Sequence, residues 1–347
     1  MIKIALVGTG SMANGHARHF EEIRGCKVTA CCDLDMARAE SFAEKYNIRE
    51  VYCDISELLL KSDIDAVSCA TVDAAHAPVS IAALKAGKHV LCEKPLASSI
   101  GDARKMALAA KRAKVINMVN FSYRDAPAIQ KAVKMIQSGE LGRVRHIEAR
   151  YMQGWLASKY WGDWRKSAHW LWRLSTEHGS AGVLGDVGVH IIDFASFPVG
   201  RIRKLDCTLK TLPKGGGKRI GKYTLDANDT AIITAEFVNG AMGSITTTRW
   251  ATGRRNSVTL SIYCDKGAVD IDLDRSRNTL FVCRGKDLDT AEWKELRCPQ
   301  TPSIYQRFIK GIKTGKNDQP DFARGLEVQK ALDACLRSDA CGKAVAV

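Results

Sequence analysis

The sequence predicts two domains, an α/β domain with a doubly wound parallel sheet and an α+β domain with an open, mostly antiparallel sheet. Two observations predict this division. Short apolar runs alternate with helical segments up to residue 122, whereas strand candidates beyond it follow one another with few helices between them. A chain of 347 residues also exceeds one ordinary hydrophobic core. We therefore predict domains at residues 1–122 and 123–347.

The first domain is predicted to alternate strands and helices, so that right-handed crossovers build a parallel sheet covered on both faces. Short apolar runs indicate strands at residues 2–7, 28–32, 66–70, 89–92 and 115–118. The segments between these strands indicate helices at residues 13–22, 36–46, 56–61, 78–86 and 101–112.

The second domain is predicted to form a largely antiparallel sheet with helices on one face. Its expected elements are a helix at 126–138, a strand at 144–151, a helix at 186–194, strands at 202–212, 230–238, 241–250, 257–264, 268–273 and 279–283, and helices at 303–313 and 322–337. Asn239-Gly240 is typical of the tight turn that joins two antiparallel strands.

Composition indicates a globular protein, since 46% of the residues are hydrophobic and 26% are charged. No apolar stretch reaches the roughly 18 residues that a membrane-spanning helix needs, and the apolar N-terminus leads directly into a glycine turn, unlike a signal peptide. The twelve cysteines form no CxxC pair and indicate buried thiols in a reducing compartment. We therefore expect a cytoplasmic protein without a membrane partner.

The net charge of +14 comes from basic residues scattered along the chain, with a local excess at residues 201–222. A nucleic-acid-binding protein would show a basic stripe interleaved with aromatic residues, or a known binding module, and the sequence has neither. We predict no nucleic-acid partner. The glycine-rich basic stretch predicts a mobile surface loop, and a mild attraction for anionic substrates stays open.

A glycine motif near the N-terminus predicts a dinucleotide site. In the run Gly8 to Ala13 the first glycine permits a tight turn, Gly10 lets the backbone approach a pyrophosphate, and the small Ala13 lets helix and strand pack closely. Ser11 and Met12 lie at the helix N-terminus, which would hold the phosphates. Because the motif follows a strand and opens a helix, it indicates a Rossmann domain rather than a glycine turn without a ligand.

Asp33 ends the second predicted strand, where a carboxylate would bond both ribose hydroxyls and repel a 2′-phosphate. This position favours NAD over NADP. Arg38 lies one turn into the next helix and could still accommodate the phosphate of NADP. We predict NAD as the cofactor, with NADP as the alternative.

The triplet Glu93-Lys94-Pro95 follows the fourth predicted strand of the first domain, at the edge where open α/β sheets bind ligands. A buried lysine there could relay a proton or polarise a carbonyl, whereas a solvated lysine at a turn is the structural alternative. Pro95 forces the backbone out of the strand, and a cis peptide bond is one way to do so.

The segment 185–193 predicts a polar helix face, because Asp186, His190 and Asp193 are spaced i, i+4 and i+7. A lysine, a histidine and a carboxylate on separate segments are the usual parts of a proton-transfer site. Together with the glycine motif they suggest hydride chemistry on a nicotinamide. The alternatives are polar groups satisfied in a core and a metal site, but we predict no metal because no further His or Cys ligand cluster is evident.

These motifs together resemble the glucose–fructose oxidoreductase/inositol dehydrogenase/rhizopine-catabolism (Gfo/Idh/MocA) family over essentially the full length. The residues that carry the resemblance are GTGSMA at 8–13, CD at 32–33, EKP at 93–95 and GDVGVHIID at 185–193, with support from Ala70-Thr71, His76, NFSYR at 120–124 and GDWR at 162–165. One departure is the segment 178–182, His-Gly-Ser-Ala-Gly, where many relatives carry a glycine run.

The resemblance implies a catalytic group of Lys94, Asp186 and His190. His190 would take the hydroxyl proton as carbon gives hydride to the nicotinamide, Lys94 would hold or relay that proton, and Asp186 would orient the sugar. The further residues that the resemblance implies are, for the cofactor, Thr71, His76, Glu93, Lys94, Asn120, Trp164 and Arg165, and, for the substrate, Lys94, Tyr123, Arg124, Asp186, His190 and Tyr305.

We therefore predict an NAD(P)-dependent oxidoreductase that acts on a hydroxyl or keto carbon of a sugar, an inositol or a related polyol. One alternative is an NAD-dependent glycoside hydrolase of the same fold that oxidises its substrate transiently. Another is a nucleotide-binding sensor without catalysis. Because an open sheet face is often apolar enough to need covering, we also expect a homo-oligomer, either a dimer or a tetramer.

Overall fold

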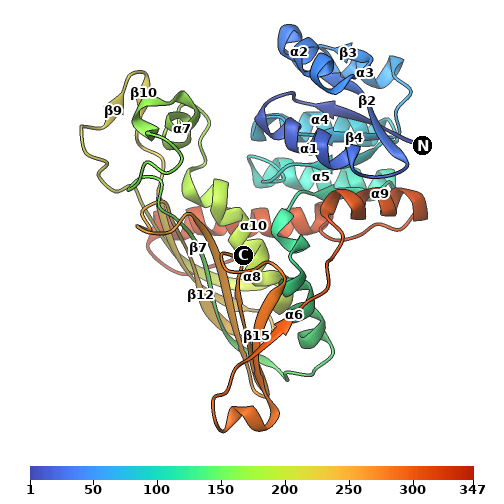
Figure 1. Cartoon of the computed structure of the whole chain (residues 1–347). Coiled ribbons are helices and arrows are strands. Elements are labelled where there is room, and N and C mark those ends of the chain that lie inside the picture. The colour runs from blue at the N-terminus through green and yellow to red at the C-terminus, as the bar shows by residue number, and fades with distance from the viewer. The chain divides into compact units, whose positions relative to one another are not determined.

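The computed structural model describes residues 1–347 and contains two compact units (Figure 1). The first unit comprises residues 1–122 and 302–329, and the second comprises residues 123–301 and 330–347. One unit holds a parallel sheet and the other a mixed, mostly antiparallel sheet. The predicted fold class is therefore confirmed.

The first unit is built on a six-stranded parallel sheet with the order β3-β2-β1-β4-β5-β6. Its strands are β1 (Ile2–Val7), β2 (Cys26–Cys32), β3 (Glu50–Tyr52), β4 (Ala66–Cys69), β5 (His89–Cys92) and β6 (Asn117–Val119). The chain order reverses between β1 and β4, which is where doubly wound sheets bind ligands. The sequence did not predict β3, because three half-buried residues are too few to show a strand pattern.

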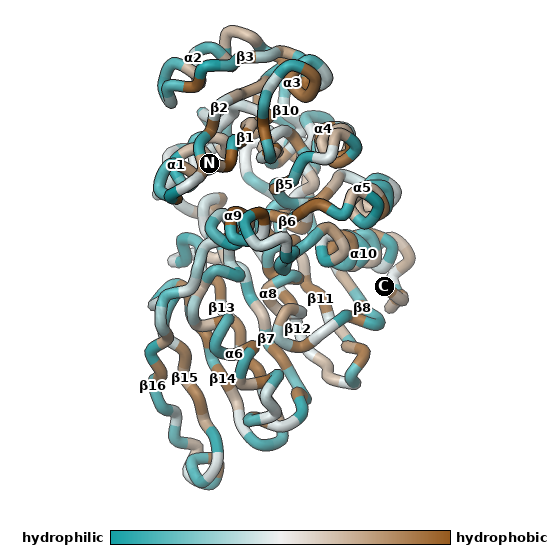
Figure 2. Tube along the Cα trace, turned by 90° about the vertical axis from the view of Figure 1, so that its right-hand side faces the viewer, coloured by the Kyte–Doolittle hydropathy of each residue, from teal (hydrophilic) through white to brown (hydrophobic).

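The helices of the first unit are α1 (Ser11–Glu21), α2 (Met36–Tyr46), α3 (Ile55–Lys61), α4 (Asp73–Lys85), α5 (Ile100–Ala113) and α9 (Ile304–Thr314). Hydrophilic residues cover much of α2, whereas β6 is largely hydrophobic (Figure 2). Helix α4 begins at Asp73, before the predicted start at Pro78, and the acidic residue in its first turn favours that N-terminus.

Helix α9 corrects one part of the predicted organisation. The predicted boundaries assigned residues 302–329 to the second domain, but in the structure this segment belongs to the first unit. The reason is its buried face, since Ile304, Phe308 and Ile309 pack in one core with Ile4 and Phe20. The pattern of a helix shows that one face is apolar, and it does not show which core that face joins.

The second unit contains a nine-stranded sheet with the order β16-β15-β14-β13-β7-β12-β11-β8-β17. Its strands are β7 (Val144–Gln153), β8 (Ile202–Lys210), β11 (Thr230–Phe237), β12 (Met242–Thr248), β13 (Asn256–Cys264), β14 (Gly267–Asp272), β15 (Thr279–Arg284), β16 (Lys294–Arg297) and β17 (Val345–Ala346). Neighbours are antiparallel except β7 and β12, which run parallel. The Asn239-Gly240 turn joins β11 to β12 as predicted, with Gly240 at φ +86°.

Helices cover one face of this sheet. Helix α8 (Val189–Val199) packs on β7, β12 and β13, and α6 (Pro127–Gln137) packs on β14 and β15 (Figure 1). A small hairpin of β9 (Arg219–Ile220) and β10 (Tyr223–Thr224) and the one-turn α7 (Ala168–Leu171) lie together beyond the sheet. The last helix, α10 (Phe322–Cys341), starts among first-unit residues and ends among second-unit residues. None of the helices combines the length and the apolar character that crossing a membrane requires.

Candidate active site

The loop between β1 and α1 has the backbone geometry of a dinucleotide cradle. Gly8 has φ +86°, and a Cβ there would lie 2.7 Å from the backbone of Ala70 and Thr71, so only glycine fits. A Cβ on Gly10 would meet nothing within 4 Å, which leaves open space before the first turn of α1. Gly10 caps that helix without a side-chain hydrogen bond, so the N–H groups of the first turn can bind an anion. The loop therefore fits a pyrophosphate.

Asp33 stands at the end of β2 beside this loop. Its carboxylate accepts hydrogen bonds from the backbone and hydroxyl of Thr9 and from the guanidinium of Arg38, with Nη2 at 2.6 Å. Burial would raise the pKa of Asp33, but the hydrogen bonds from Arg38 and Thr9 outweigh burial and lower that pKa to about 2. The carboxylate is therefore ionised at neutral pH, as a ribose acceptor must be.

Glu93 of the Glu-Lys-Pro triplet lies in a buried network that the sequence did not predict. His16 Nε2 is 2.9 Å from Glu93 Oε1, and the other ring nitrogen of His16 is 2.8 Å from Ser68 Oγ. Asn120 Nδ2 donates to Glu93 Oε1 and, at 3.0 Å, to the hydroxyl of Tyr305. Because an ionised carboxylate only accepts, His16 Nε2 carries the proton in this pair.

The network brings together three predicted residues of the first unit, Glu93, Asn120 and Tyr305. Burial would raise the pKa of Glu93, but the hydrogen bond from His16 and the charges of His16 and Lys94 lower it to about 2. Asn120 Oδ1 is buried and has no hydrogen-bond partner in the chain. Such an acceptor fits the amide group of a nicotinamide, and it supports the predicted cofactor contact of Asn120.

The lowered pKa of Glu93 predicts a pH-dependent contribution to stability. The folded state favours the ionised carboxylate, so this contribution is complete above about pH 4.5 and is lost as the pH falls toward 2. A shift of this size corresponds to about 3 kcal/mol. We expect Glu93→Gln to lower the free energy of unfolding in urea strongly at pH 7 and by roughly 40% of that amount near pH 3. An equal loss at both pH values would contradict the assignment.

Lys94 and Thr71 lie in the loops that follow β5 and β4, and His76 lies in the first turn of α4. His76 is fully buried and joins these loops, with Nδ1 2.8 Å from Pro95 O and Nε2 3.3 Å from Thr71 O. Lys94 is half-buried and the Lys94–Pro95 peptide bond is cis. The two loops are therefore held to each other at the carboxyl edge of the sheet, where the sequence placed the cofactor.

The structure also brings together Cys69, His76 and Cys92, whose potential metal-ligand atoms lie within 4.8 Å of one another. This cluster differs from the prediction of no His or Cys ligand cluster, because its members come from two strands and a helix and are distant in the sequence. A hydrogen bond from Cys92 lowers the pKa of the Cys69 thiol to about 6 in spite of burial. Both ring nitrogens of His76 face backbone carbonyl oxygens, so the backbone already orients this ring.

In the second unit, Asp186 lies in a π-helical turn, η4 (Leu184–Gly188), that leads directly into α8. The sequence predicted one regular α-helical face with Asp186, His190 and Asp193. The wider π turn changes that spacing, and π turns of this kind are frequent at functional sites. Asp186 is one-third exposed, whereas Asp193 is buried, so the three side chains do not share one environment.

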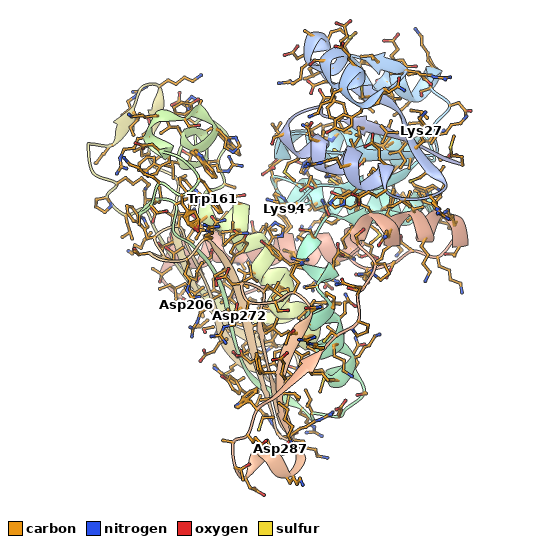
Figure 3. The ribbon with its side chains drawn as sticks, viewed as in Figure 1. Lys27, Lys94, Trp161, Asp206, Asp272 and Asp287 are labelled. Atoms are coloured by element: carbon orange, nitrogen blue, oxygen red, sulfur yellow. The ribbon has the colours of Figure 1, made fainter.

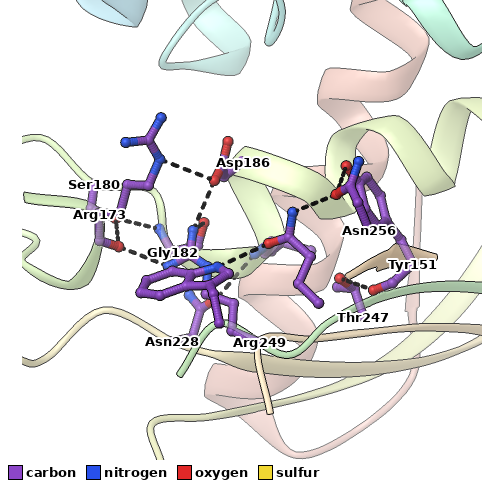
Figure 4. A network of polar contacts seen from close by, with 12 residues as sticks. Tyr151, Arg173, Ser180, Gly182, Asp186, Asn228, Thr247, Arg249 and Asn256 are labelled. Atoms are coloured by element: carbon purple, nitrogen blue, oxygen red, sulfur yellow. Dashed lines mark hydrogen bonds and ion pairs between the residues drawn. The ribbon is translucent and has the colours of Figure 1, made fainter. Parts of the chain in front are cut away.

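Two arginines that the sequence analysis did not single out hold the Asp186 carboxylate (Figure 4). The fully buried Arg249 donates from Nη2 to Asp186 Oδ2 at 2.9 Å and from Nη1 to Arg173 O at 2.8 Å. The Nε atom of Arg173 lies 3.7 Å from the same carboxylate oxygen. Burial lowers the pKa of Arg249, and the Asp186 carboxylate opposes that effect. The two arginines thereby position the Asp186 carboxylate.

His190 lies in the first turn of α8 among aromatic side chains. Its ring meets Tyr123 edge to face at 5.1 Å and lies 6.4 Å from the ring of Tyr151. The hydroxyls of Tyr123 and Tyr151 are 2.7 Å apart, and both contact the Asn256 side chain. Burial raises the pKa of Tyr151, so this hydroxyl stays protonated at neutral pH. Tyr123, predicted as a substrate residue, therefore lies beside His190.

Arg124 and Asp193 form a separate buried ion pair. The Arg124 guanidinium donates two hydrogen bonds to Asp193, at 2.6 and 2.7 Å, and stacks on Phe197 at 4.0 Å. Each side chain is only 2% exposed. The sequence predicted Arg124 as a substrate contact, whereas these observed contacts of Arg124 belong to the fold.

Trp164 lies in a small core with Trp155, Leu171 and Leu174, and the exposed Arg165 lies at its surface. Trp164 is 2% exposed, and Arg165 covers its ring at 4.3 Å and donates to Lys214 O. Lys214 corrects a further expectation: it is buried and pairs with Asp229 at 2.6 Å, so this part of the basic stretch is not a solvated loop. The cofactor contacts of Trp164 and Arg165 stay predictions.

Each unit thus carries a part of the predicted site. The first unit holds the glycine loop with Asp33 and Arg38, and the group around Glu93, Lys94 and Asn120. Figure 3 labels Lys94 in the first unit and Trp161 in the second. The second unit holds Asp186, His190 and Tyr123.

Two family models match most of the chain. One, described as the oxidoreductase family with an NAD-binding Rossmann fold, matches residues 2–121, and the Gfo/Idh/MocA C-terminal domain matches residues 129–270. Levoglucosan dehydrogenase of Pseudarthrobacter phenanthrenivorans is 28% identical, covering 98% of this chain and 96% of its own length. D-glucoside 3-dehydrogenase of Escherichia coli is 27% identical over 81% of this chain and 77% of its own.

Solved structures agree with these relatives. A levoglucosan dehydrogenase in complex with NADH and levoglucosan has a TM-score of 0.87 at 26% identity and covers 100% of this chain and 99% of its own. An oxidoreductase domain protein from Kribbella flavida has the same TM-score at 29% identity, with 100% and 99% coverage. The predicted class of enzyme and its NAD cofactor are confirmed at the level of the family. By its two matched domains, its cradle and its motif residues, the chain belongs to the Gfo/Idh/MocA family of NAD-binding oxidoreductases.

Proposed function

We propose that the chain transfers hydride between a nicotinamide and a CH–OH carbon of a sugar, an inositol or a related polyol. The proposal is carried by two residues of the second unit: Asp186, which two arginines hold in the turn η4, and His190, which follows it in α8. The other unit of the chain has a dinucleotide cradle. The named activities of the relatives, on levoglucosan and D-glucosides, support a carbohydrate substrate.

An alcohol oxidation removes a hydride from carbon and a proton from oxygen, and different groups of the site carry out these two steps. Bound NAD⁺ supplies the hydride acceptor. His190 takes the hydroxyl proton, Lys94 holds or relays it, and Asp186 orients the sugar. The reverse reaction uses the same groups, with the proton returned to the oxygen. Tyr123 and Tyr305 contact the substrate in this proposal.

We propose NAD as the preferred cofactor of this chain. The Asp33 carboxylate, ionised and next to the glycine loop, suits two ribose hydroxyls and repels a 2′-phosphate. The bidentate contact of Arg38 with Asp33 occupies the cation that could otherwise bind that phosphate. Activity with NADP above that with NAD would contradict this preference.

The test is NADH formation, followed by absorbance, across neutral sugars, inositols, uronates and sugar phosphates with NAD and with NADP. Turnover that disappears in a His190→Ala variant supports the dehydrogenase. Tight NAD binding without turnover on any of these compounds overturns it and favours the NAD-dependent glycoside hydrolase, for which glycosides are then assayed. Loss of NAD binding as well would contradict both.

We also propose that the chain is cytoplasmic and forms a homo-oligomer. All twelve cysteines are free thiols, which suits a reducing compartment. The sheet of the second unit exposes Ile232, Met242 and Tyr263, three large hydrophobic residues on strands of one sheet. Analytical ultracentrifugation distinguishes a monomer, which would contradict this proposal, from a dimer or a tetramer.

A further inference from the structure

We infer that the substrate carries an anionic group, either a carboxylate or a phosphoryl group, and that Arg173 binds it. The inference rests on the proposed function, because it names the substrate class of the same site. Its basis is an excess of positive charge at one end of the nine-stranded sheet, together with two guanidinium groups that share a single carboxylate.

One end of the sheet is defined by the strand registers. Thr230 pairs with Thr248 and Asn256 pairs with Gln153, so β7 and β12 finish where β11 and β13 begin. Four connections with charged residues lie at this end, residues 154–186, 211–229, 249–255 and 273–278. They contain thirteen Lys and Arg residues but only six Asp and Glu residues. Because Asp186 is among these six, the charge excess surrounds the predicted substrate site.

The opposite end of the same sheet has no such excess. Its connections, residues 140–143, 200–201, 238–241, 265–266 and 285–293, contain four Lys and Arg residues against five Asp and Glu residues. Asp287, labelled in Figure 3, belongs to this end. The asymmetry is therefore local and does not simply reflect the high net charge of the chain. A concentration of one sign of charge around a site attracts ligands of the opposite sign.

Arg173 is the member of this group that is placed to bind a ligand. It and Arg249 both pair with Asp186, and neither has a second carboxylate within the 4.0 Å range of an ion pair. Arg249 is fully buried and makes the shorter contact, so the Asp186 charge balances Arg249 first. One carboxylate cannot neutralise two guanidinium groups, and the remaining positive charge lies at Arg173.

The geometry of Arg173 suits recognition. Its side chain is 24% exposed, and the guanidinium lies over the rings of Trp172, at 4.7 Å, and Trp170, at 5.3 Å. One terminal nitrogen, Nη1, donates to His169 O at 2.6 Å. A guanidinium that is held on aromatic rings is pre-organised for a bidentate contact with a carboxylate or a phosphate. An anion bound there would lie next to Asp186, the residue proposed to orient the sugar (Figure 4).

The experiment compares glucose with glucuronate and with glucose 6-phosphate, and galactose with galacturonate, as substrates with NAD. We expect the anionic member of at least one pair to have the higher kcat/KM, and the two anion types show whether the group is a carboxylate or a phosphate. Arg173→Gln should lower kcat/KM for the anionic substrate by about 10- to 100-fold more than for its neutral partner, with the additional loss mainly in KM. Arg173→Lys should recover part of the lost kcat/KM, because lysine keeps the positive charge but lacks the two parallel N–H donors of a guanidinium.

The matched control is Arg201→Gln. Arg201 is an exposed arginine at the opposite end of the sheet, and its replacement should change kcat/KM neither for the anionic nor for the neutral substrate. Two results would overturn the inference. One is a higher kcat/KM for each neutral sugar than for its anionic counterpart, and the other is an equal loss of kcat/KM on neutral and anionic substrates in Arg173→Gln. Either result would leave the proposed dehydrogenase activity intact. If no compound turns over, titration calorimetry of the NADH-bound protein with glucuronate and with glucose 6-phosphate decides separately. Binding of either that Arg173→Gln abolishes supports the anionic site, and no binding of both rejects it.

Discussion

Replacement of His190 by alanine is expected to lower kcat by about 10²- to 10⁴-fold, because a general base of this kind contributes that much to proton transfer. NAD affinity should be unchanged, since His190 lies on α8 of the second unit and the glycine loop lies in the first. The measurement is the rate of NADH formation with the best substrate of the panel, together with NAD titration by fluorescence. A His190→Ala variant with nearly full kcat would remove His190 from the proposed mechanism.

A matched control for this variant exists on β7. His146 is an exposed histidine of the same unit whose ring stacks on Tyr263 at 6.1 Å, near the start of the strand. His146→Ala removes the same side chain without touching the aromatic group around His190. We expect kcat and NAD affinity to stay at the wild-type values. A comparable loss in both variants would point to a general effect on folding.

Replacement of Arg249 by methionine is expected to cost about 1.5–3 kcal/mol of unfolding free energy, the range for hydrogen bonds to charged groups, because Asp186 is one-third exposed and keeps Arg173 as a second partner. The change removes the donor to Asp186 Oδ2 at 2.9 Å and to Arg173 O at 2.8 Å, and it leaves the carboxylate without its nearest counter-charge. It also removes the contact of the guanidinium with the Trp155 ring at 5.2 Å. Urea unfolding measures the loss, and kcat should fall with it because Asp186 is no longer positioned.

Arg150→Met is the control for this second variant. Arg150 is exposed and pairs with Glu148 on the same strand at 2.8 Å, a pair that contributes less than about 1 kcal/mol. The loss of unfolding free energy in Arg249→Lys should lie between the losses in Arg249→Met and Arg150→Met. An ammonium keeps the charge but cannot donate to all the acceptors that a guanidinium reaches. If Arg249→Met and Arg150→Met had equal, small effects, the buried arginine would have no role in holding Asp186.

The regular elements of the fold were predictable because their patterns repeat over many residues. The strand at residues 2–7 and the helix at residues 36–46 have the predicted bounds. The structure adds the short strands β3, β9, β10, β16 and β17, none longer than four residues. So short a segment completes at most two repeats of the strand period, and its pairing depends on a neighbour distant in the sequence.

The candidate site was predictable where a backbone requirement leaves a residue signature. Gly8 must be glycine because its φ is positive and a Cβ would meet the backbone of Ala70. His16 was missed, although a histidine within the apolar stripe of Ala13, Ala17 and Phe20 is a signal that a buried polar partner must exist. Arg249 carries no such local signal, since an arginine at the end of a strand is usually solvated.

The sequence by itself therefore determined the two fold classes, the dinucleotide loop and the identity of Lys94, Asp186 and His190 as candidates, because these depend on local conformation and on the spacing of residues along one element. Only the tertiary structure decided that α9 joins the Rossmann core, that Asp193 pairs with Arg124, and that two arginines share Asp186. Those contacts join residues up to hundreds of positions apart, and their strength depends on burial, which a periodic pattern does not specify.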